Sequence, residues 1–118
     1  MTKVYYYDRC STCKKALAWL DANGVTYEKI DIKGDHPDEA TLRELHKKSG
    51  VPLKRFFNTS GMLYRDMQLS TKLPSMGEDE QFKILASDGM LVKRPLLVTD
   101  GAVCAGFRET EWRAALGK

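Results

Sequence analysis

The fold is decided by the segment KVYYYDRCSTCKK, residues 3–15. Aromatic and β-branched side chains over residues 3–7 are typical of a strand. After this segment, apolar side chains recur at helical spacing until the stop signal Asn23-Gly24. The cysteine pair, Cys10 and Cys13, is therefore predicted to lie where a strand passes directly into a helix.

The two cysteines of this C-x-x-C motif are predicted to have different roles. The first turn of a helix presents unpaired N–H groups and the positive end of the helix dipole, which stabilise a thiolate over a thiol. Cys10 lies just before this turn and is expected to be the attacking nucleophile. Nearby basic side chains act in the same direction; they are Arg9, Lys14 and Lys15. Cys13 lies on the helix face that should pack on the sheet, so it is expected to be the shielded thiol that resolves the adduct in a redox disulfide with Cys10.

Two other interpretations of the cysteine pair remain open. The pair could form half of a zinc site with Cys104, His36 or His46, although the sequence has no second C-x-x-C and no H-x-x-x-H partner. It could also consist of two buried, unreactive residues, although the strand context and the basic flank argue against this. We therefore expect no metal site, and redox or nucleophilic chemistry is the favoured interpretation.

Length and composition restrict the class of protein. With 118 residues, of which 42% are apolar, the chain is predicted to form a single domain, residues 1–118. It shows neither the apolar region of a signal peptide nor an apolar run that could span a bilayer, so we expect a cytoplasmic protein without membrane contact. The net charge of +3 comes from interspersed acidic and basic residues. This pattern argues against direct nucleic-acid binding and suits a small anionic substrate.

The first half of the chain is predicted to form a βαβ unit. Residues 25–32 alternate loosely between apolar and polar side chains, as in a half-buried strand, and this strand should run parallel to the first one. A further helix is predicted to start at Asp35, which would cap it, with Pro37 in its first turn, and to end at Gly50.

The second half of the chain is predicted to be helical first and then to return to the sheet. Residues 51–77 are interrupted by glycine and proline and predict short helical turns, and residues 78–87 predict a regular helix. An apolar strand over 94–99, the turn Asp100-Gly101 and a returning strand over 102–105 predict a hairpin. A last helix should follow, and Cys104 is interpreted as a small buried residue.

This order of elements predicts the fold class. A βαβ unit, a helical stretch and a ββα unit make up the element pattern of the thioredoxin fold. We therefore expect an α/β protein with a mixed four-stranded sheet flanked by helices. The helical stretch, about residues 37–90, is expected to be an insertion between the two halves.

Five stretches spread over nearly the whole chain carry a resemblance to a known family. They are CSTCKK (10–15), FFNTSG (56–61), Tyr64-Arg65, LASDGMLVKRP (85–95) and GFR (106–108). Together they resemble the arsenate reductase and Spx family of thioredoxin-fold proteins. The resemblance is specific to the family and less specific to one activity within it.

The resemblance implies roles for several residues. Cys10 corresponds to the cysteine that attacks arsenate in glutaredoxin-coupled arsenate reductases, and Arg94 corresponds to an oxyanion-binding arginine. Pro95 is similar to the cis-proline that thioredoxin-like proteins place beside the active thiol. Lys14 and Arg108 are expected as further contacts of the substrate.

The chain departs from the arsenate reductase pattern at two anion-binding positions. Asn58 stands where those reductases carry an arginine, and Gly106-Phe107-Arg108 replaces an arginine-proline pair. A multiply charged oxyanion needs charge-assisted hydrogen bonds, so other cations would have to replace these arginines. The candidates are Arg108, Lys14, Lys54 and Arg55.

Cys13 is a third difference, because the glutaredoxin-coupled reductases rely on glutathione instead of a second cysteine at this position. With an internal resolving thiol the chain resembles the Spx-like branch, whose members act as redox switches and bind the RNA polymerase α subunit. The resemblance therefore implies two functions. One is a reductase of a disulfide or small oxyanion, without a bound cofactor, that takes electrons from glutathione with glutaredoxin or from thioredoxin. The other is a redox-sensing regulator that binds the RNA polymerase α subunit.

Overall fold

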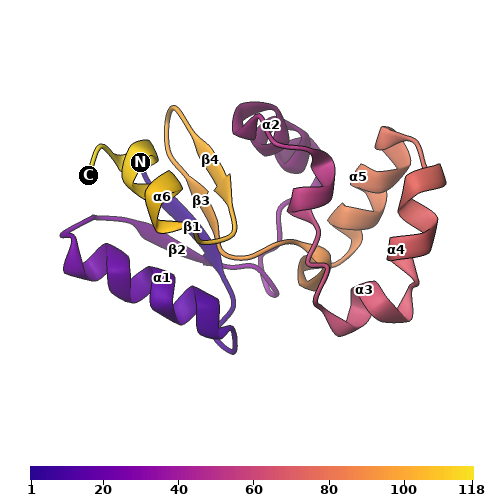
Figure 1. The fold of residues 1–118 in the computed structure, drawn as a ribbon, viewed down its shortest axis with the longest axis horizontal. Helices are drawn as coiled ribbons and strands as arrows, with labels where there is room; N and C mark the ends of the chain where they lie inside the picture. Colours follow the sequence, from indigo (N-terminus) through magenta and orange to yellow (C-terminus); the bar gives the residue numbers. More distant parts are fainter.

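Strand β1 (Lys3–Tyr6) is central to the sheet in the computed structural model, which describes all 118 residues. It pairs in parallel with β2 (Glu28–Asp31) and antiparallel with β3 (Leu96–Val98), which pairs antiparallel with β4 (Val103–Ala105). The strand order is therefore β2-β1-β3-β4. Helices α1 (Ser11–Ala22) and α6 (Glu109–Leu116) lie together on one side of the sheet, and the other helices lie on its opposite side (Figure 1).

Helix α1 packs on the sheet through a small hydrophobic cluster. Its buried members come from β1, α1, β3 and α6; they are Val4, Ala16, Leu20, Leu97 and Trp112. Cys13 is buried on the same face of α1. Successive strand residues point to opposite faces of a sheet, so Leu97 belongs to this cluster and Leu96 to the other one. The chain leaves α1 at Gly24, whose φ of +66° favours glycine.

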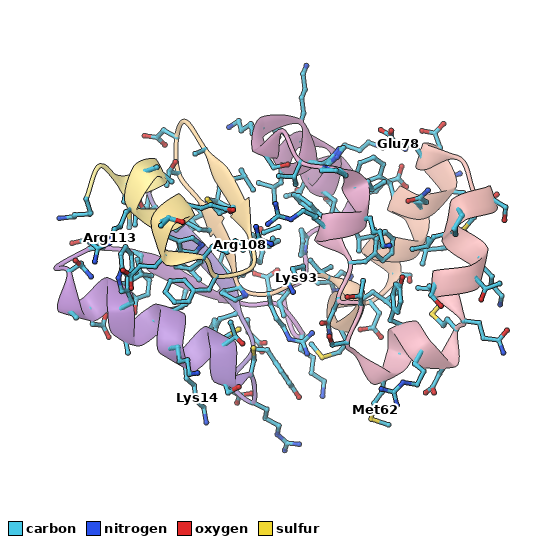
Figure 2. The ribbon with its side chains drawn as sticks, in the orientation of Figure 1. Lys14, Met62, Glu78, Lys93, Arg108 and Arg113 are labelled. Carbon is cyan, nitrogen blue, oxygen red and sulfur yellow. The ribbon has the colours of Figure 1, made fainter.

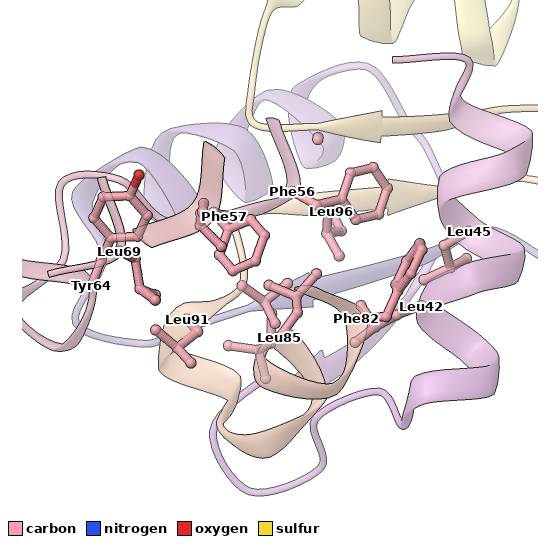
Figure 3. Packing of buried hydrophobic residues seen from close by; sticks show 14 of the residues in the cluster. Leu42, Leu45, Phe56, Phe57, Tyr64, Leu69, Phe82, Leu85, Leu91 and Leu96 are labelled. Carbon is pink, nitrogen blue, oxygen red and sulfur yellow. The ribbon is translucent and has the colours of Figure 1, made fainter. Parts of the chain in front are cut away.

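The other face of the sheet carries a larger cluster of 15 buried residues (Figure 3). Most of them come from the helical segment between β2 and β3. Its elements are α2 (Glu39–Ser49), η1 (Leu53–Phe56), α3 (Met62–Asp66), α4 (Leu69–Lys72), η2 (Leu73–Ser75), α5 (Glu78–Ser87) and η3 (Gly89–Leu91). Phe56 and Phe82 are fully buried in this cluster. Two backbone hydrogen bonds join the residues at the end of η1 to η3 and to the chain before β3: the Asn58 N–H donates to the Leu91 carbonyl, and the Lys93 N–H donates to the Phe56 carbonyl.

The thioredoxin-like fold, with its mixed four-stranded sheet flanked by helices, agrees with the prediction. Helix α5 has the predicted bounds, and α1 ends at the predicted stop signal. The turn Asp100-Gly101 joins β3 to β4, and the Thr99 N–H donates to the Ala102 carbonyl across it at 2.8 Å. None of the helices combines the length and the apolar character that a membrane-spanning segment needs.

Helix α2 begins later than predicted. Asp38, and not Asp35, is its N-cap, because the Asp38 carboxylate accepts the Thr41 N–H at 2.8 Å. Asp35 instead belongs to a turn after β2, in which its N–H donates to the Asp31 carbonyl at 2.8 Å. Pro37 therefore lies before the cap and not in the first helical turn. Since α2 begins at Glu39, the Thr41 N–H belongs to its first turn, and Asp38 stands three residues before it, within reach of that N–H.

Strands β2 and β3 are shorter than predicted, covering 28–31 and 96–98 in place of 25–32 and 94–99. β1 begins at Lys3, which is the partner of Glu28, so the residues before 28 lie beyond the end of the neighbouring strand. Pro95 precedes β3 and has no N–H to donate to a ladder. The length of a strand thus depends on its partner strand, and the local sequence pattern gives no information about that partner.

Candidate active site

Cys10 caps the N-terminus of α1. The Cys13 N–H donates to Cys10 Sγ at 3.3 Å, and the Cys10 N–H donates to the Tyr7 carbonyl at 3.1 Å. The sulfur therefore faces the N–H groups that have no partner inside the helix. Cys10 is half-buried and lines a large cleft. Its predicted position, at the turn from strand to helix, is confirmed.

Cys13 lies in the first turn of α1 and is fully buried. Burial is the main cause that raises the pKa of its thiol to about 12, and a hydrogen bond with Cys10 adds to this. A hydrogen bond with the Tyr7 backbone and, to a smaller extent, the positive charge of Arg94 act on this pKa in the opposite direction. Cys13 is therefore a neutral thiol near pH 7. All three cysteines of the chain are free. The predicted shielding of Cys13 is observed.

A cleft of about 570 Å³ opens beside Cys10. Its walls come from the start of α1, from η1 and the loop after it, from the segment before β3 and from the segment between β4 and α6. Five of its lining residues are cationic and none is acidic; the cations are Lys54, Arg55, Lys93, Arg94 and Arg108. Figure 2 shows Lys93 and Arg108 in the middle of the molecule, between the sheet and the helical segment. The cleft therefore has a positive potential that attracts anions.

Arg94 is held only weakly by other protein groups. It takes part in none of the ion pairs of the protein. Its Nη1 donates a long hydrogen bond of 3.4 Å to the Met90 carbonyl, and its Nε is buried without a partner. Its Cζ lies 5.1 Å from the centroid of the Tyr7 ring. Guanidinium N–H groups without partners leave Arg94 able to bind an anion.

Arg55 and Arg108 share one carboxylate at the edge of the cleft. Arg55 Nη2 lies 3.9 Å from Glu111 Oε1, and Arg108 Nη1 lies 3.5 Å from Glu111 Oε2. Arg55 Nη2 also donates to the Ala105 carbonyl at 3.5 Å. Both ion pairs are longer than a close charge-assisted hydrogen bond and are partly exposed, so they are weak. Gly106, at φ +82°, turns the chain from β4 toward Arg108.

The structure brings most of the predicted site residues together. Cys10, Arg94 and Arg108 line the same cleft. Pro95 is buried next to Arg94, and the peptide bond between them is cis, as the resemblance implies. Lys14 does not line the cleft, and its side chain extends into solvent from the outer side of α1 (Figure 2).

Of the four cations considered as replacements for missing arginines, Lys54, Arg55 and Arg108 line the cleft and Lys14 does not. Asn58, which stands in place of one of those arginines, also lines it, together with Thr59 and Ser60. Lys93 was not predicted as a site residue. Its position beside Arg94 in the sequence is the one signal that could have indicated it.

The alternative interpretations of the cysteines can be compared with the geometry. No group of three or more His, Cys, Asp or Glu side chains lies close enough together to hold a metal ion. Cys104, interpreted as a buried residue, is only half-buried, although Val103 and Ala105 on either side of it in β4 are buried. Burial, followed by the negative charge of Glu111, raises the pKa of its thiol.

Residues 5–115 match the ArsC family. The uncharacterized protein YusI of Bacillus subtilis is 48% identical over 108 residues, which cover 92% of each chain. The crystal structure of an ArsC family related protein from Bacteroides fragilis has a TM-score of 0.94 and 46% sequence identity, and the match covers 96% of this chain and 95% of that chain.

At lower identity the named functions differ. An arsenate reductase from Neisseria meningitidis is 25% identical over 105 residues, which cover 88% of each chain. The global transcriptional regulator Spx of Staphylococcus epidermidis is 22% identical over 116 residues, which cover 98% of this chain and 87% of that protein. These similarities support the family more strongly than either activity.

Proposed function

We propose, from the premise that this chain belongs to the ArsC family, that it is a thiol-dependent reductase of a small anionic substrate. The substrate is an oxyanion such as arsenate, or the disulfide of an anionic thiol. Cys10 is the nucleophile, Cys13 resolves the adduct, and Arg94 stabilises the negative charge of the substrate. Arg108, from the segment between β4 and α6, is a further contact of the substrate.

One observation carries this proposal: Cys10 lines a cleft that contains five cationic residues and no acidic one. The positive potential concentrates anions next to the sulfur. A nucleophile beside hydrogen-bond donors that are already in place is the arrangement that stabilises charge in a transition state. A buried, unreactive cysteine would have no need of such surroundings.

With a disulfide substrate, the Cys10 thiolate attacks one sulfur, and the S–S bond of the substrate breaks. The leaving thiolate takes a proton from solvent. Cys13 then loses its proton to solvent and attacks the Cys10 sulfur, which releases the second half of the substrate as a thiolate that takes a proton from solvent. The substrate gains two electrons, and the cysteine pair loses two as the Cys10–Cys13 disulfide forms.

With arsenate, the Cys10 thiolate forms an S–As bond, and one oxygen of arsenate takes up protons from solvent and leaves arsenic as water. Cys13 loses its proton to solvent and attacks the Cys10 sulfur, the electron pair of the S–As bond stays on arsenic, and arsenite leaves. Reduction of As(V) to As(III) is thus balanced by oxidation of two thiols to one disulfide. Glutathione with glutaredoxin, or thioredoxin, then reduces the disulfide, so no bound cofactor is needed.

The test is NADPH consumption by the purified protein, coupled in parallel to thioredoxin and to glutathione with glutaredoxin. Arsenate and a model disulfide are offered separately, each corrected for a reaction without the protein. Cys10→Ser should reduce turnover to background, and Cys13→Ser should trap a mixed disulfide on Cys10. Cys104→Ser is the matched control and should stay active. Equal turnover by Cys10→Ser and wild type would contradict the proposal.

The results with the two substrates distinguish an oxyanion reductase from a general oxidoreductase and from a regulator. Turnover of arsenate supports an oxyanion reductase, whereas turnover of the disulfide alone supports a general oxidoreductase. Absence of Cys10-dependent turnover with both contradicts the reductase proposal and favours the regulator. That function is tested by a pull-down with the C-terminal domain of the RNA polymerase α subunit, using reduced and oxidised protein.

A further inference from the structure

We propose that Tyr7 is a positioning residue, whose ring holds the Arg94 guanidinium at the cleft without neutralising its charge. This inference rests on the proposed function in one respect, namely that Arg94 receives the anion. It adds a residue that touches neither the substrate nor the reacting sulfur. Tyr7 itself is not among the residues that line the cleft, whereas Arg94 is.

The contacts of Arg94 support this role for the ring. Arg94 Cζ lies 5.1 Å from the centroid of the Tyr7 ring, within the distance of about 6 Å at which a cation is attracted to an aromatic face. The guanidinium makes one hydrogen bond to the protein, the long one of 3.4 Å from Nη1 to the Met90 carbonyl. The ring is therefore the main group that can fix the orientation of Arg94.

Four other arginines of the protein each pair with a carboxylate: Arg43 with Glu39 and Asp79, Arg113 with Glu109, and Arg55 and Arg108 with Glu111. Arg43 and Arg113 also lie over aromatic rings, at 4.6 Å from Phe82 and 5.3 Å from Trp19, so Arg94 differs from them in having an aromatic ring without a carboxylate. A carboxylate cancels the charge of the arginine that it holds. An aromatic face attracts the cation through its quadrupole but has no net charge, so the full charge of Arg94 stays available to an anion.

The position of Tyr7 in the chain connects Arg94 to the nucleophile. Tyr7 directly follows β1, and its carbonyl accepts the Cys10 N–H at 3.1 Å. Its ring packs against the larger hydrophobic cluster, where it is half-buried. One residue thus fixes the turn that carries Cys10 by its backbone and supports Arg94 by its side chain.

The neighbouring residue, Tyr6, provides a matched control. Tyr6 points to the opposite face of the sheet, packs against the smaller cluster and carries its own cation, since Lys29 Nζ lies 5.4 Å from its ring centroid. Neither Tyr6 nor Lys29 lines the cleft. Tyr6→Leu therefore removes the same kind of contact at a place that does not affect the site.

The experiment compares the alkylation rates of Cys10 by iodoacetate, which is negatively charged, and by iodoacetamide, which is neutral, with peptide mapping to identify the modified cysteine. The ratio of the two rates measures the positive charge held near the sulfur and needs no turnover. Tyr7→Leu should lower this ratio about threefold or more, whereas Tyr7→Phe, which keeps an aromatic face, should preserve it. Tyr6→Leu should leave it unchanged.

Two further measurements separate positioning from a packing defect. In an Arg94→Met background, Tyr7→Leu should have no additional effect on the ratio, because the two residues act through one contact. Phenylalanine with fluorine substituents at position 7 keeps the shape of the ring and weakens its negative face, so the ratio should fall in steps as fluorine is added. If Tyr7→Leu does not fold, the fluorinated series alone still tests whether the ring holds Arg94.

An unchanged ratio in the fluorinated series would overturn the inference, as would an equal decrease in Tyr6→Leu. Its failure is distinguishable from failure of the proposed function. A ratio that depends on Tyr7 and Arg94 in a protein without turnover supports the positioning role and contradicts the reductase. Turnover that depends on Cys10 and Arg94, together with an alkylation ratio that does not depend on Tyr7, supports the reductase and contradicts the positioning role.

Discussion

The two sides of the cleft are built in different ways. On one side, Cys10 stands at the start of α1, which is held to the sheet by the smaller cluster around Trp112. On the other side, Lys54 and Arg55 stand on η1, a four-residue element whose position depends on Phe56 in the larger cluster. The hydrogen bonds of Cys10 come from neighbouring residues of the chain, Tyr7 and Cys13, and distant residues act on it only through the placement of α1. Lys54 and Arg55 have no such local frame, so their positions depend on packing between distant segments.

Thiol chemistry and charge selectivity are therefore expected to depend on separate parts of the molecule. Changes in the smaller cluster should disturb the cysteines first, whereas changes in the cleft cations should alter substrate binding and leave the cysteines intact. Substitutions on each side of the cleft and a pH series test this separation.

Trp112→Ala should have the largest effect on stability. It removes the largest fully buried side chain and leaves the Gly106 carbonyl without the Trp112 Nε1 donor, now at 3.0 Å. We expect a loss of about 3–5 kcal/mol in the free energy of unfolding, measured in urea. Cys13 should also become accessible to alkylation below the unfolding transition. Phe82→Ala, in the larger cluster, is the control and should leave Cys13 protected until the protein unfolds; equal exposure of Cys13 in both variants would contradict the separation.

Arg94→Met should weaken binding of the anionic substrate next most strongly. Removal of a guanidinium that makes charge-assisted hydrogen bonds is expected to raise KM about tenfold or more. Lys14→Met is the comparison, because Lys14 lies close to Cys13 in sequence but does not line the cleft. Its KM should stay within about twofold of wild type. Steady-state kinetics of the three proteins check this, and similar increases in both variants would show that proximity in sequence matters more than placement in the cleft.

The stability of the protein at alkaline pH should depend on the buried Cys13 thiol. The pKa of the Cys13 thiol is raised from 9.0 to about 12 in the folded chain, so folding favours the protonated form. This contribution to stability is complete below pH 9 and is lost as the pH rises through 12. The free energy of unfolding should therefore decrease over this range. Cys13→Ala should make the slope shallower, by at most about 1.4 kcal/mol per pH unit.

Urea unfolding at a series of pH values measures this slope. Cys104→Ala is a useful comparison, because burial also raises the pKa of the Cys104 thiol but that side chain is only half-buried. Its effect on the slope should be the smaller one. Identical slopes in wild type and Cys13→Ala would refute the buried, protonated state of Cys13.

Glu111→Gln should give the smallest change. The Glu111 carboxylate partly neutralises Arg55 and Arg108, so its removal should lower KM for an anionic substrate about twofold to fivefold and leave kcat unchanged. Glu109→Gln is the matched control on the same helix turn, because Glu109 pairs with Arg113 at 3.1 Å and not with a cleft residue. A higher KM in Glu111→Gln would mean that the carboxylate orients the two arginines and does not compete with the substrate.

The parts of the fold that could be predicted are those with local signals. The C-x-x-C turn, helix α5 and the turn Asp100-Gly101 depend on caps, helical spacing and turn residues within a few positions. The start of α2 was misplaced because Asp35 and Asp38 both offer a capping carboxylate, and only the three-dimensional course of the chain selects Asp38.

The site was predictable to a similar extent. Cys10 and Arg94 were identified from motif and resemblance, and both line the cleft. Lys93 was missed because the cleft that it lines is formed by segments distant in sequence. Lys14 does not line the cleft, since it lies outside the buried face of α1 that Cys13, Ala16 and Leu20 form. The contribution of Arg55 likewise depends on hydrogen bonds such as that from the Lys93 N–H to the Phe56 carbonyl, which join segments almost forty residues apart.

The pairing of a buried Cys13 with Cys10 also limits how many electrons one chain can donate. In the proposed reaction, one chain can give up two electrons and then holds its oxidised state in a bond that only Cys10 exposes to the cleft. A reduced sample without an electron donor should therefore convert one equivalent of substrate per chain and stop. The amount of substrate converted in this single round equals the amount of intact cysteine pairs. The time needed to regain activity after the donor is added measures the rate at which the donor reduces the disulfide.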